Sequence, residues 1–507
     1  MKNLKTQFAV LALSLSLLSA LLLIAARPAQ AQTESVLYNF CSAANCTDGS
    51  HPQSRLTSDG QGNFYGTTET GGTFGPGTVF ELSPDGSGGW NETVLYSFTG
   101  GADGGYPEFS YVIFDSGGNL YGTTFNGGAT GDGVVFELSP VGGGWTETVL
   151  YSFANGTDGA YPVNGLIRDT AGNLYGTTYQ GGNTAGTVFE LSPSGGSWTE
   201  QLIYSFSSSA PDNEAGLTMD SSGNIFGASA STVFELSPNG SGGWNPTVIH
   251  TFPSAPKDGS SPQGTLVLDA AGNLYGTTTK GGAKDYGTVY KLSLGTNGKW
   301  KEKILHSFTG ATKDGSEPWA GIVFDAAGNI YGTSVLGGNG NCDSGCGTVF
   351  ELVALVGTGS YKEKVLWSFN AKDGALPYSS LILDSAGNLY GTTGSGGQSG
   401  DGVVFEVNPS AVATKTTLSS SLNPSLVGQT VTFTAVVSSA AGAPPDGETV
   451  TFMEGSTVLG TGSLTSGSAS FATSALPVGT NLITAVYGGD LNFEGSTSKA
   501  VKQRVKP

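Results

Sequence analysis

At 507 residues the chain is too long for one ordinary core, so we expect several domains, or one array of repeats with an appended domain. Its 81 glycines and 12% charged residues are unusual, but 10% aromatic residues supply enough apolar surface to pack, which indicates a folded, all-β protein. Its 21 basic residues against 40 acidic ones give a formal net charge of -19, which argues against a nucleic-acid partner.

The N-terminus has the pattern of a secretory signal. Two lysines precede an apolar run from Phe8 to Ala26, and Ala29-Gln30-Ala31 supplies the small residues of a cleavage site. We predict a signal peptide over residues 1–31, with an uncleaved anchor as the alternative. The mature chain is then expected to be exported (extracellular, at the cell surface or periplasmic), with no integral membrane segment.

A short motif recurs along the chain. Asp-x-x-Gly-Asn, followed by two apolar residues and glycine, occurs seven times at spacings of 49 to 59 residues. Its asparagines are Asn63, Asn119, Asn173, Asn224, Asn273, Asn329 and Asn388. A near-constant period of this size predicts a solenoid, an array or a propeller.

Each period contains four short runs of β-branched and aromatic residues bounded by turn residues, which predicts four strands. In the fifth repeat these runs are 264–269, 273–278, 287–292 and 303–308. Between the first two, we expect the Asp269 carboxylate to accept backbone N–H bonds and Gly272 to take a left-handed conformation. The repeated motif is therefore interpreted as a structural turn, in preference to a metal site.

The ends of the array indicate how it closes. No fourth run follows the third run of the last repeat (403–407), whereas an extra copy stands at 36–40, before the first repeat. A ring explains this arrangement, because the N-terminal strand can complete the last sheet and remove an exposed edge. We predict a monomeric, seven-bladed β-propeller over residues 35–407, closed by a strand from the N-terminus.

The composition changes after the repeats. A linker is predicted at residues 408–414, and alternating Thr, Ser and Val residues predict a β-sandwich over residues 415–507. The expected strands lie within 429–437, 448–455, 468–476 and 481–490.

The repeated strings "GNLYGTT", "GTVFELSP" and "ETVLYSF" resemble the GloVer tandem-repeat family of exported bacterial proteins. The resemblance covers nearly all of residues 35–407 and implies no assigned activity. "TTLSSSLNPSLVGQTVTFTAVV" and "YGGDLNFEGSTS" are similar to the bacterial Ig-like repeat domain of secreted and surface proteins.

Histidines offer little chemistry in this sequence. His250 and His306 occupy a fourth-strand position that is aromatic in the other repeats, so both are interpreted as packing substitutes, and only His51 remains, on a loop. Without a second loop histidine, Ser-His-Asp and Cys-His pairs and a His-rich metal site are unsupported. We predict no catalytic residue, no metal ligand and no cofactor.

Two sets of carboxylates recur. The third-strand glutamates are candidates for acid–base work, but Lys291 takes their place in repeat five, which favours solvation or local pairing. They are Glu81, Glu137, Glu190, Glu235, Glu351 and Glu406. The loops before six repeats carry Asp-Gly, at Asp48, Asp103, Asp158, Asp258, Asp314 and Asp373. Calcium binding is one interpretation of these loops, and a repeated turn is the preferred one.

The four cysteines form two close pairs in sequence, Cys41 with Cys46 and Cys342 with Cys346. In an exported protein they predict two local disulfides, each stabilising its loop by about 2 kcal/mol. A zinc site is the alternative if the two loops meet.

Aromatic residues on the loops of repeats two and three are the candidate ligand site. Tyr106, Phe125, Tyr161 and Tyr179 are expected to stack on sugar rings, with packing on neighbouring loops as the alternative. The sequence thus favours a non-catalytic protein of binding or adhesion type for a glycan or envelope component. A propeller hydrolase or lyase acting on polysaccharide and a purely structural envelope protein are the alternatives.

Overall fold

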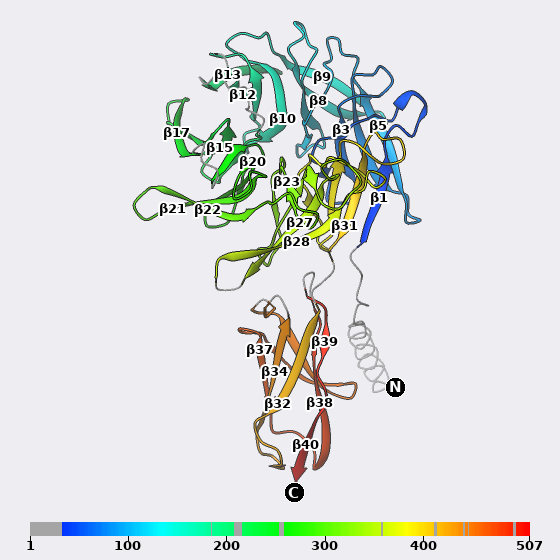
Figure 1. Ribbon diagram of the computed structural model, residues 1–507, viewed down its shortest axis with the longest axis vertical. Coiled ribbons are helices and arrows are strands. Elements are labelled where there is room, and N and C mark those ends of the chain that lie inside the picture. The colour runs from blue at the N-terminus through cyan, green and yellow to red at the C-terminus, as the bar shows by residue number, and fades with distance from the viewer. Residues whose placement is uncertain are drawn as a thin grey trace, which may run out of the picture. The chain divides into compact units, whose positions relative to one another are not determined.

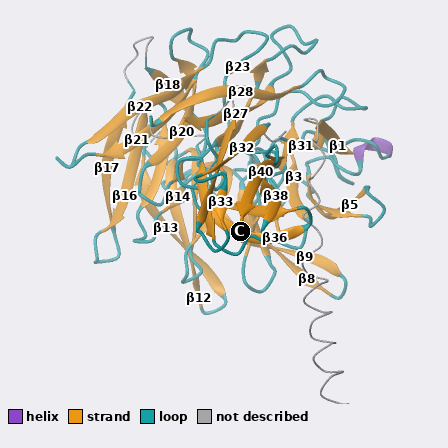
Figure 2. Ribbon diagram, turned by 90° about the horizontal axis from the view of Figure 1, so that it is seen from below, coloured by secondary structure: helices purple, strands orange, loops and turns teal. Residues whose placement is uncertain are grey.

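The computed structural model describes residues 33–183, 185–206, 215–252, 258–355, 358–409, 413–439, 442–444, 446–489 and 493–507. The predicted signal peptide and residues 410–412 of the predicted linker lie outside this part of the chain. The described residues are all-β, as predicted: their helical element is the short 3-10 helix η1 (Ala44–Cys46), and they contain no helix long and apolar enough to cross a membrane. Figure 2 shows the described residues almost entirely as strands and loops. The chain divides into two compact units, of which the first contains Glu34–Ala354 and Gly359–Asn408 and the second Pro409–Pro507.

Each repeat of the first unit folds as one antiparallel sheet of neighbouring strands (Figure 1). The first three sheets are β2 (Thr57–Ser58), β3 (Phe64–Thr68), β4 (Thr78–Pro84) and β5 (Trp90–Ser97); β6 (Ile113–Phe114), β7 (Leu120–Thr124), β8 (Val134–Val141) and β9 (Gly144–Ser152); and β10 (Ala160–Arg168), β11 (Leu174–Gln180), β12 (Thr187–Ser194) and β13 (Ser197–Ser205). The fourth is β14 (Thr218–Met219), β15 (Ile225–Ser229), β16 (Thr232–Pro238) and β17 (Trp244–Thr251).

The fifth and sixth sheets follow the same order with small additions. The fifth is β18 (Gly259–Pro262), β19 (Val267–Leu268), β20 (Leu274–Gly281), β21 (Thr288–Leu294) and β22 (Trp300–Ser307). The sixth is β24 (Val323–Phe324), β25 (Ile330–Ser334), β27 (Thr348–Leu355) and β28 (Ser360–Ser368), beside the two-stranded pair β23 (Gly315–Ser316) and β26 (Leu336–Gly337).

The seventh sheet takes its fourth strand from the other end of the chain. β1 (Thr33–Asn39) lies next to β31 (Val403–Asn408), followed by β30 (Leu389–Thr393) and β29 (Ile382–Leu383). The Phe40 amide donates to the Gly402 carbonyl at 3.1 Å, and the Phe98 amide makes the matching bond to Gly77 within the first repeat at 3.0 Å. The pairing leaves β31 with a partner on both sides.

Among the described residues of the first unit, seven apolar clusters fill the spaces between neighbouring sheets. In each, an aromatic residue after the fourth strand of one repeat packs among third-strand residues of the next. Phe98 of repeat one, for example, lies edge-on to Phe136 of repeat two, with centroids 5.2 Å apart. One of the seven clusters contains Phe40 and Tyr390 together with Phe80, and so joins repeat seven to repeat one.

The Asp-x-x-Gly-Asn motif forms the predicted turn. Oδ1 of Asp269 accepts the backbone N–H groups of Ala271 and Asn273, both at 2.9 Å, and Gly272 has φ +77°. The asparagine adds a bond that was not predicted, because its Nδ2 donates to Oδ2 of Asp269 at 2.7 Å. Tyr275 donates to the same oxygen, so the turn is also tied to the following strand.

The first strand of each repeat is more broken than predicted. Residues 264–269 were expected as one strand, but only β19 (Val267–Leu268) and β18, which ends at Pro262, pair with β20. β10 is one strand, but its register shifts between Val163 and Ile167. Residues at such breaks leave the regular ladder, and Asn164 in β10 and Gln263 and Thr265 between β18 and β19 line the pocket described below.

The second unit contains two sheets around one apolar core. One comprises β32 (Thr414–Ser420), β34 (Val431–Ser439) and β37 (Ser468–Thr473). The other comprises β33 (Ser425–Leu426), β40 (Val501–Lys506), β38 (Gly479–Tyr487), β35 (Thr449–Glu454), β36 (Thr457–Ser463) and β39 (Ser496–Thr497). Alternate residues of the strands, such as Phe433 and Ala435, point into this core, which gives the period of two expected for a sandwich.

Candidate functional site

The predicted aromatic site residues lie close together, but partly against one another. The Phe125 ring stacks on Tyr161, with centroids 4.9 Å apart and an angle of 20°, and lies 6.3 Å from Tyr179. The Tyr106 carbonyl accepts the Phe125 amide at 2.9 Å, while its side chain is 37% exposed. Three of the four rings therefore contact a neighbouring ring, and Tyr106 is the more open one.

A proline, here called the loop proline, stands four residues after each Asp-Gly aspartate, and the residue before it has a left-handed backbone in these six repeats. These prolines are Pro52, Pro107, Pro162, Pro262, Pro318 and Pro377. Tyr106 has φ 56° and Tyr161 has φ 58°. The equivalent residues with φ between 55° and 58° are His51, Ser261, Glu317 and Leu376. Because the conformation recurs with unrelated side chains, it belongs to the loop architecture and does not by itself mark a ligand site.

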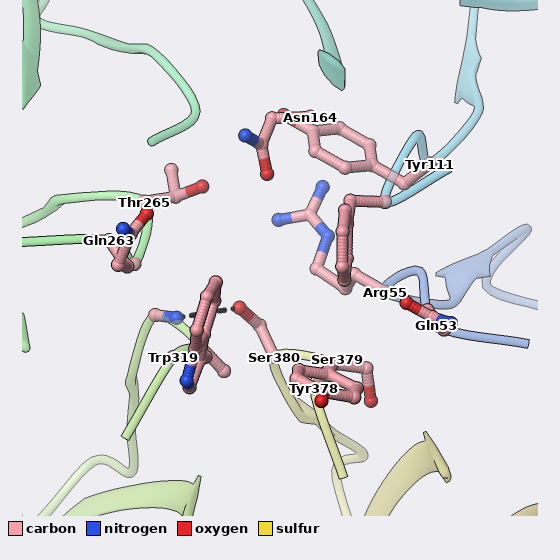
Figure 3. Close-up of a pocket in the computed structure, with 14 residues that line it drawn as sticks. Gln53, Arg55, Tyr111, Asn164, Gln263, Thr265, Trp319, Tyr378, Ser379 and Ser380 are labelled. Atoms are coloured by element: carbon pink, nitrogen blue, oxygen red, sulfur yellow. Dashed lines mark hydrogen bonds between the residues drawn. The ribbon is translucent and has the colours of Figure 1, made fainter. Parts of the chain in front are cut away.

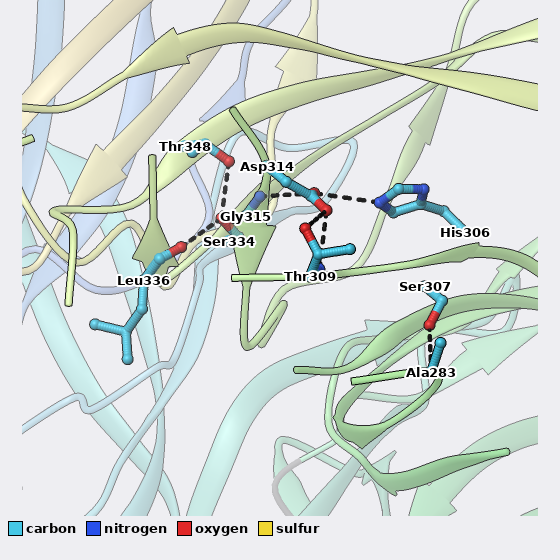
Figure 4. A network of polar contacts seen from close by, with 9 residues as sticks. All are labelled: Ala283, His306, Ser307, Thr309, Asp314, Gly315, Ser334, Leu336 and Thr348. Carbon is cyan, nitrogen blue, oxygen red and sulfur yellow. Dashed lines mark hydrogen bonds and ion pairs between the residues drawn. The ribbon is translucent and has the colours of Figure 1, made fainter. Parts of the chain in front are cut away.

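Five of the six Asp-Gly aspartates close the described loop before their repeat by accepting a backbone N–H from three to six residues earlier, as the turn interpretation requires. Asp314 accepts the Thr309 amide at 2.8 Å and its hydroxyl at 2.7 Å, and His306 Nε2 lies 3.3 Å away (Figure 4). Although burial opposes ionisation, these bonds from His306 and Thr309 hold the Asp314 pKa below its ordinary value.

Both fourth-strand histidines pack as predicted. The rings of His250 and His306 lie edge-on to Phe252 and Phe308, each with centroids 4.6 Å apart, as Tyr96 does to Phe98 at 5.2 Å.

The third-strand glutamates are locally paired, as expected. Tyr65 donates to Glu81 at 3.0 Å, and the same tyrosine-to-glutamate bond recurs in four other repeats. In repeat five Lys291 instead lies 5.0 Å from the Tyr275 ring centroid and 3.7 Å from Asp269.

A second set of glutamates, on the fourth strands, was missed by the sequence analysis. Each has Oε1 buried without a hydrogen-bond partner among the described residues: Glu34, Glu92, Glu147, Glu200, Glu302 and Glu363. Burial, and then the charge of the loop aspartate that precedes the repeat, raises the pKa of Glu92 to about 8 and that of Glu147 to about 7. Their recurrence two residues after a tryptophan in most repeats was the available signal.

One group of side chains could hold a cation. Ligand atoms of His250, Asp258 and Glu302 lie within 4.8 Å of one another, and His250 Nε2 is 3.7 Å from Oε2 of Glu302. A second group includes Cys41 and Cys46, but these sulfurs form a disulfide, as do Cys342 and Cys346. Both predicted disulfides are thus present.

The first unit also contains a central pocket, which the sequence analysis did not identify. Its cavity volume is about 50 Å³, and residues near the start of six repeats line it (Figure 3). They are Gln53, Arg55, Phe109, Tyr111, Asn164, Gln263, Gly264, Thr265, Trp319, Ala320, Gly321, Tyr378, Ser379 and Ser380. All of them follow the loop proline or its equivalent, where the first strand is broken.

Aromatic rings form much of the central pocket wall. The Trp319 and Phe109 rings both lie edge-on to Tyr378, with centroids 5.8 Å and 5.7 Å from it. Tyr111 faces the guanidinium of Arg55, whose Cζ lies 4.2 Å from the ring centroid. These four rings come from three different repeats.

Two polar groups in the central pocket lack partners. Arg55 forms no ion pair with a described carboxylate, and its Nε is buried without a hydrogen-bond acceptor in the described structure. Gln263 is only 7% exposed, and its Oε1 has no described donor. Ser380 differs, because its hydroxyl accepts the Gly321 amide at 2.9 Å. The pocket thus offers a cationic donor and a neutral acceptor beside aromatic walls.

These pocket residues break the repeat pattern, and that was the signal available in the sequence. Arg55, Tyr111, Thr265, Gly321 and Ser380 each stand four residues before the aspartate of the repeated turn. A structural position in seven similar repeats would be expected to keep similar residues. This position varies from arginine to glycine.

Comparison with known families and structures gives the following similarities. The profile described as Gloeobacter/Verrucomicrobia repeat matches residues 26–232 and 228–441, and that of the bacterial Ig-like domain (group 3) matches residues 416–506. No curated protein matches the chain.

Among solved structures, the chain is similar to the extracellular domain of a one-component system from B. thetaiotaomicron, at 12% identity and a TM-score of 0.46, covering 93% of this chain and 58% of that one. A polysaccharide lyase, PL25 ulvan lyase bound to -[GlcA(1-4)Rha3S]-, matches at 11% identity and a TM-score of 0.44, covering 74% and 95%. An oxidoreductase (glucose dehydrogenase) from Thermus thermophilus matches at 13% and 0.37, covering 74% and 99%. The chain spans less than two thirds of the first of these structures. These likenesses identify neither a ligand nor a reaction for this chain.

Proposed function

The chain belongs to the Gloeobacter/Verrucomicrobia repeat family, and we propose that it is an exported, non-catalytic protein that binds a glycan in its central pocket. The observation that carries the proposal is the convergence of aromatic rings from three repeats around unpartnered polar groups. Aromatic faces pack on the apolar faces of sugar rings, while convergent polar groups orient the hydroxyls. Tyr106, the most exposed of the predicted aromatic residues, is proposed as a further contact.

The architecture proposed for this function is a closed, seven-bladed propeller over residues 35–407, followed by the linker at 408–414 and the Ig-like sandwich at 415–507. Seven sheets joined by seven apolar clusters support closure, since an open row of seven sheets has only six interfaces. The Thr392 hydroxyl donates to the Ser54 carbonyl at 2.9 Å, as Thr277 does to Ala320 between repeats five and six. The ring brings the start of each repeat to one axis.

The chemistry of the lining supports binding without catalysis. The described residues of the central pocket include no aspartate, glutamate, histidine or cysteine. Paired carboxylates for glycoside hydrolysis and the base of a nucleophilic pair are therefore missing from this lining. Export is supported by the two disulfides, which persist in oxidising compartments.

A glycan array with the full chain tests the proposal. Trp319→Ala should weaken binding of any hit by about tenfold or more, because truncation removes a half-buried aromatic ring of the kind that dominates binding sites. Phe74→Ala is the matched control, since this ring is 62% exposed on a loop outside the pocket lining. Equal binding by both variants and the parent would reject the central pocket as the site.

A polysaccharide lyase is the second candidate, because a tyrosine and an arginine lie together in the pocket. In a β-elimination, Tyr111 would act as a phenolate that removes the proton next to the sugar carboxylate, and the glycosidic oxygen would leave from the adjacent carbon with the proton that the tyrosine hydroxyl returns. The Arg55 guanidinium, 4.2 Å from the centroid of this ring, would pair with the carboxylate. Incubating each array hit with the protein and following ultraviolet absorbance of unsaturated sugars separates the two. A product that forms with the parent protein and is absent with Tyr111→Phe would establish the lyase.

A further inference from the structure

From the two unpartnered groups of the central pocket we infer that its ligand is an acidic sugar, held by its carboxylate on Arg55 and by a hydroxyl on Gln263. This inference rests on the proposed glycan-binding function and adds the chemical class of the ligand. It is carried by charge, by hydrogen-bonding capacity and by the size of the cavity.

Charge singles out Arg55. The chain has a formal net charge of -19 and only four arginines, of which Arg55 lies in the central pocket. No described carboxylate forms an ion pair with it, and its Cζ lies 4.2 Å from the centroid of the Tyr111 ring. In such an acidic protein, an unneutralised cation among apolar rings favours an anion, and the fork of a guanidinium matches a carboxylate.

Gln263 specifies the other end of the ligand. Its amide oxygen is an acceptor buried to more than nine tenths, and leaving such a group unpaired is costly. A carboxylate cannot donate to it, whereas a sugar hydroxyl can. A ligand that satisfies both groups therefore carries an acid and a hydroxyl on one small framework.

The dimensions are consistent with a terminal residue. The cavity is small, with a volume of about 50 Å³. A carboxylate fits this space, and the sugar ring would then lie against Trp319 and Tyr378 at its wall. Sugar acids at the end of a chain thus suit the pocket better than residues within a polymer.

Isothermal titration of the full chain tests this inference with two probes, a short oligoglucuronate and the neutral gluco-oligosaccharide of equal length and linkage. We expect the acidic probe to bind at least about tenfold more tightly, and added salt to reduce only this difference. Arg55→Gln should weaken binding of the acidic probe by at least about tenfold and remove the preference, with a smaller effect on the neutral probe. Arg168→Gln, at an exposed arginine outside the pocket, should leave both affinities unchanged.

The outcomes separate the inference from the function on which it rests. Equal binding of the two probes by the parent protein, with Trp319→Ala weakening both, would overturn the acidic class and retain glycan binding. Binding of neither probe would overturn both the acidic class and the glycan function, and no effect of Trp319→Ala on a probe that binds would reject the central pocket as the site. If acetate competes as strongly as glucuronate, the pocket recognises a carboxylate alone and not a sugar acid. If a sulfated oligosaccharide binds more tightly than the oligoglucuronate, the pocket recognises sulfate and not carboxylate. Both results contradict the inference. Arg55→Lys, which keeps the charge and loses the fork, should show an intermediate preference if Arg55→Gln fails to fold.

Discussion

Replacing Phe40 by alanine removes the side chain that joins the first strand of the chain to the first complete repeat. The Phe40 ring is fully buried, and its centroid lies 5.0 Å from that of Phe80 at an angle of 63°. Truncating a buried phenylalanine costs about 3–5 kcal/mol, because the lost transfer energy and the cavity add. We expect Phe40→Ala to lower the free energy of unfolding of the repeat unit by this amount in equilibrium denaturation, and its melting temperature by several degrees.

Phe98→Ala is the matched control for this prediction. Phe98 occupies the same place between repeats one and two, is also fully buried, and lies 5.2 Å from Phe136 at 64°. A closed ring gives the two positions equal burial, so the two losses should agree to within about 1 kcal/mol. If β1 detaches in solution, Phe40→Ala will melt with the parent while Phe98→Ala melts earlier, and the closure will be wrong. Deleting residues 33–41 should cause a larger loss than either substitution.

Three further predictions follow from the repeated contacts. The raised pKa of the fourth-strand glutamates means that the folded protein binds protons more tightly than the unfolded chain, so stability is greatest below about pH 4.5 for these groups and falls as pH rises to about 8. With EDTA present to remove bound cations, the melting temperature should therefore be higher at about pH 5.5 than at about pH 8.5. Glu147→Gln should reduce this difference. A melting temperature that rises with pH would contradict the raised pKa of these glutamates. Gly122→Ala should destabilise by about 1–3 kcal/mol in denaturant titrations, because its new methyl would lie 2.6 Å from the Phe136 ring, whereas Gly144→Ala, with nothing nearer than 4.0 Å, should be neutral. Replacing Cys342 and Cys346 by serine should lower the free energy of unfolding by about 2 kcal/mol. The variant is compared with the parent protein, treated with and without reductant. Equal melting temperatures of the oxidised parent and the variant would show that the disulfide adds no stability.

Much of the fold was readable because the sequence repeats its local chemistry. The Asp269 turn, the strand that follows it and the edge-on contact of His250 with Phe252 all depend on neighbours within one repeat, and seven copies reduce the ambiguity of each. The central pocket was not readable in this way. Whether Arg55 and Gln263 share a cavity depends on how the interrupted first strands of distant repeats lie relative to one another. The alternation of apolar and polar residues in a strand sequence does not indicate where that strand is interrupted by a bulge.

The same repetition explains why the candidate site lies where it does. Residues that pack between one repeat and the next, such as the phenylalanines after the fourth strands, are of the same type in each repeat, because each fills an equivalent interface. Residues that line the pocket also contact neighbouring repeats, since the Gly321 amide donates to the Ser380 hydroxyl and a side chain at Gly321 would meet the Thr265 backbone, but these contacts differ from repeat to repeat. Variation there, from Arg55 to Gly321, makes one asymmetric pocket from similar parts. Binding specificity in such an array of repeats is therefore expected to reside at the residues in which the repeats differ, and grafting Arg55 and Gln263 onto another member's repeats should transfer it.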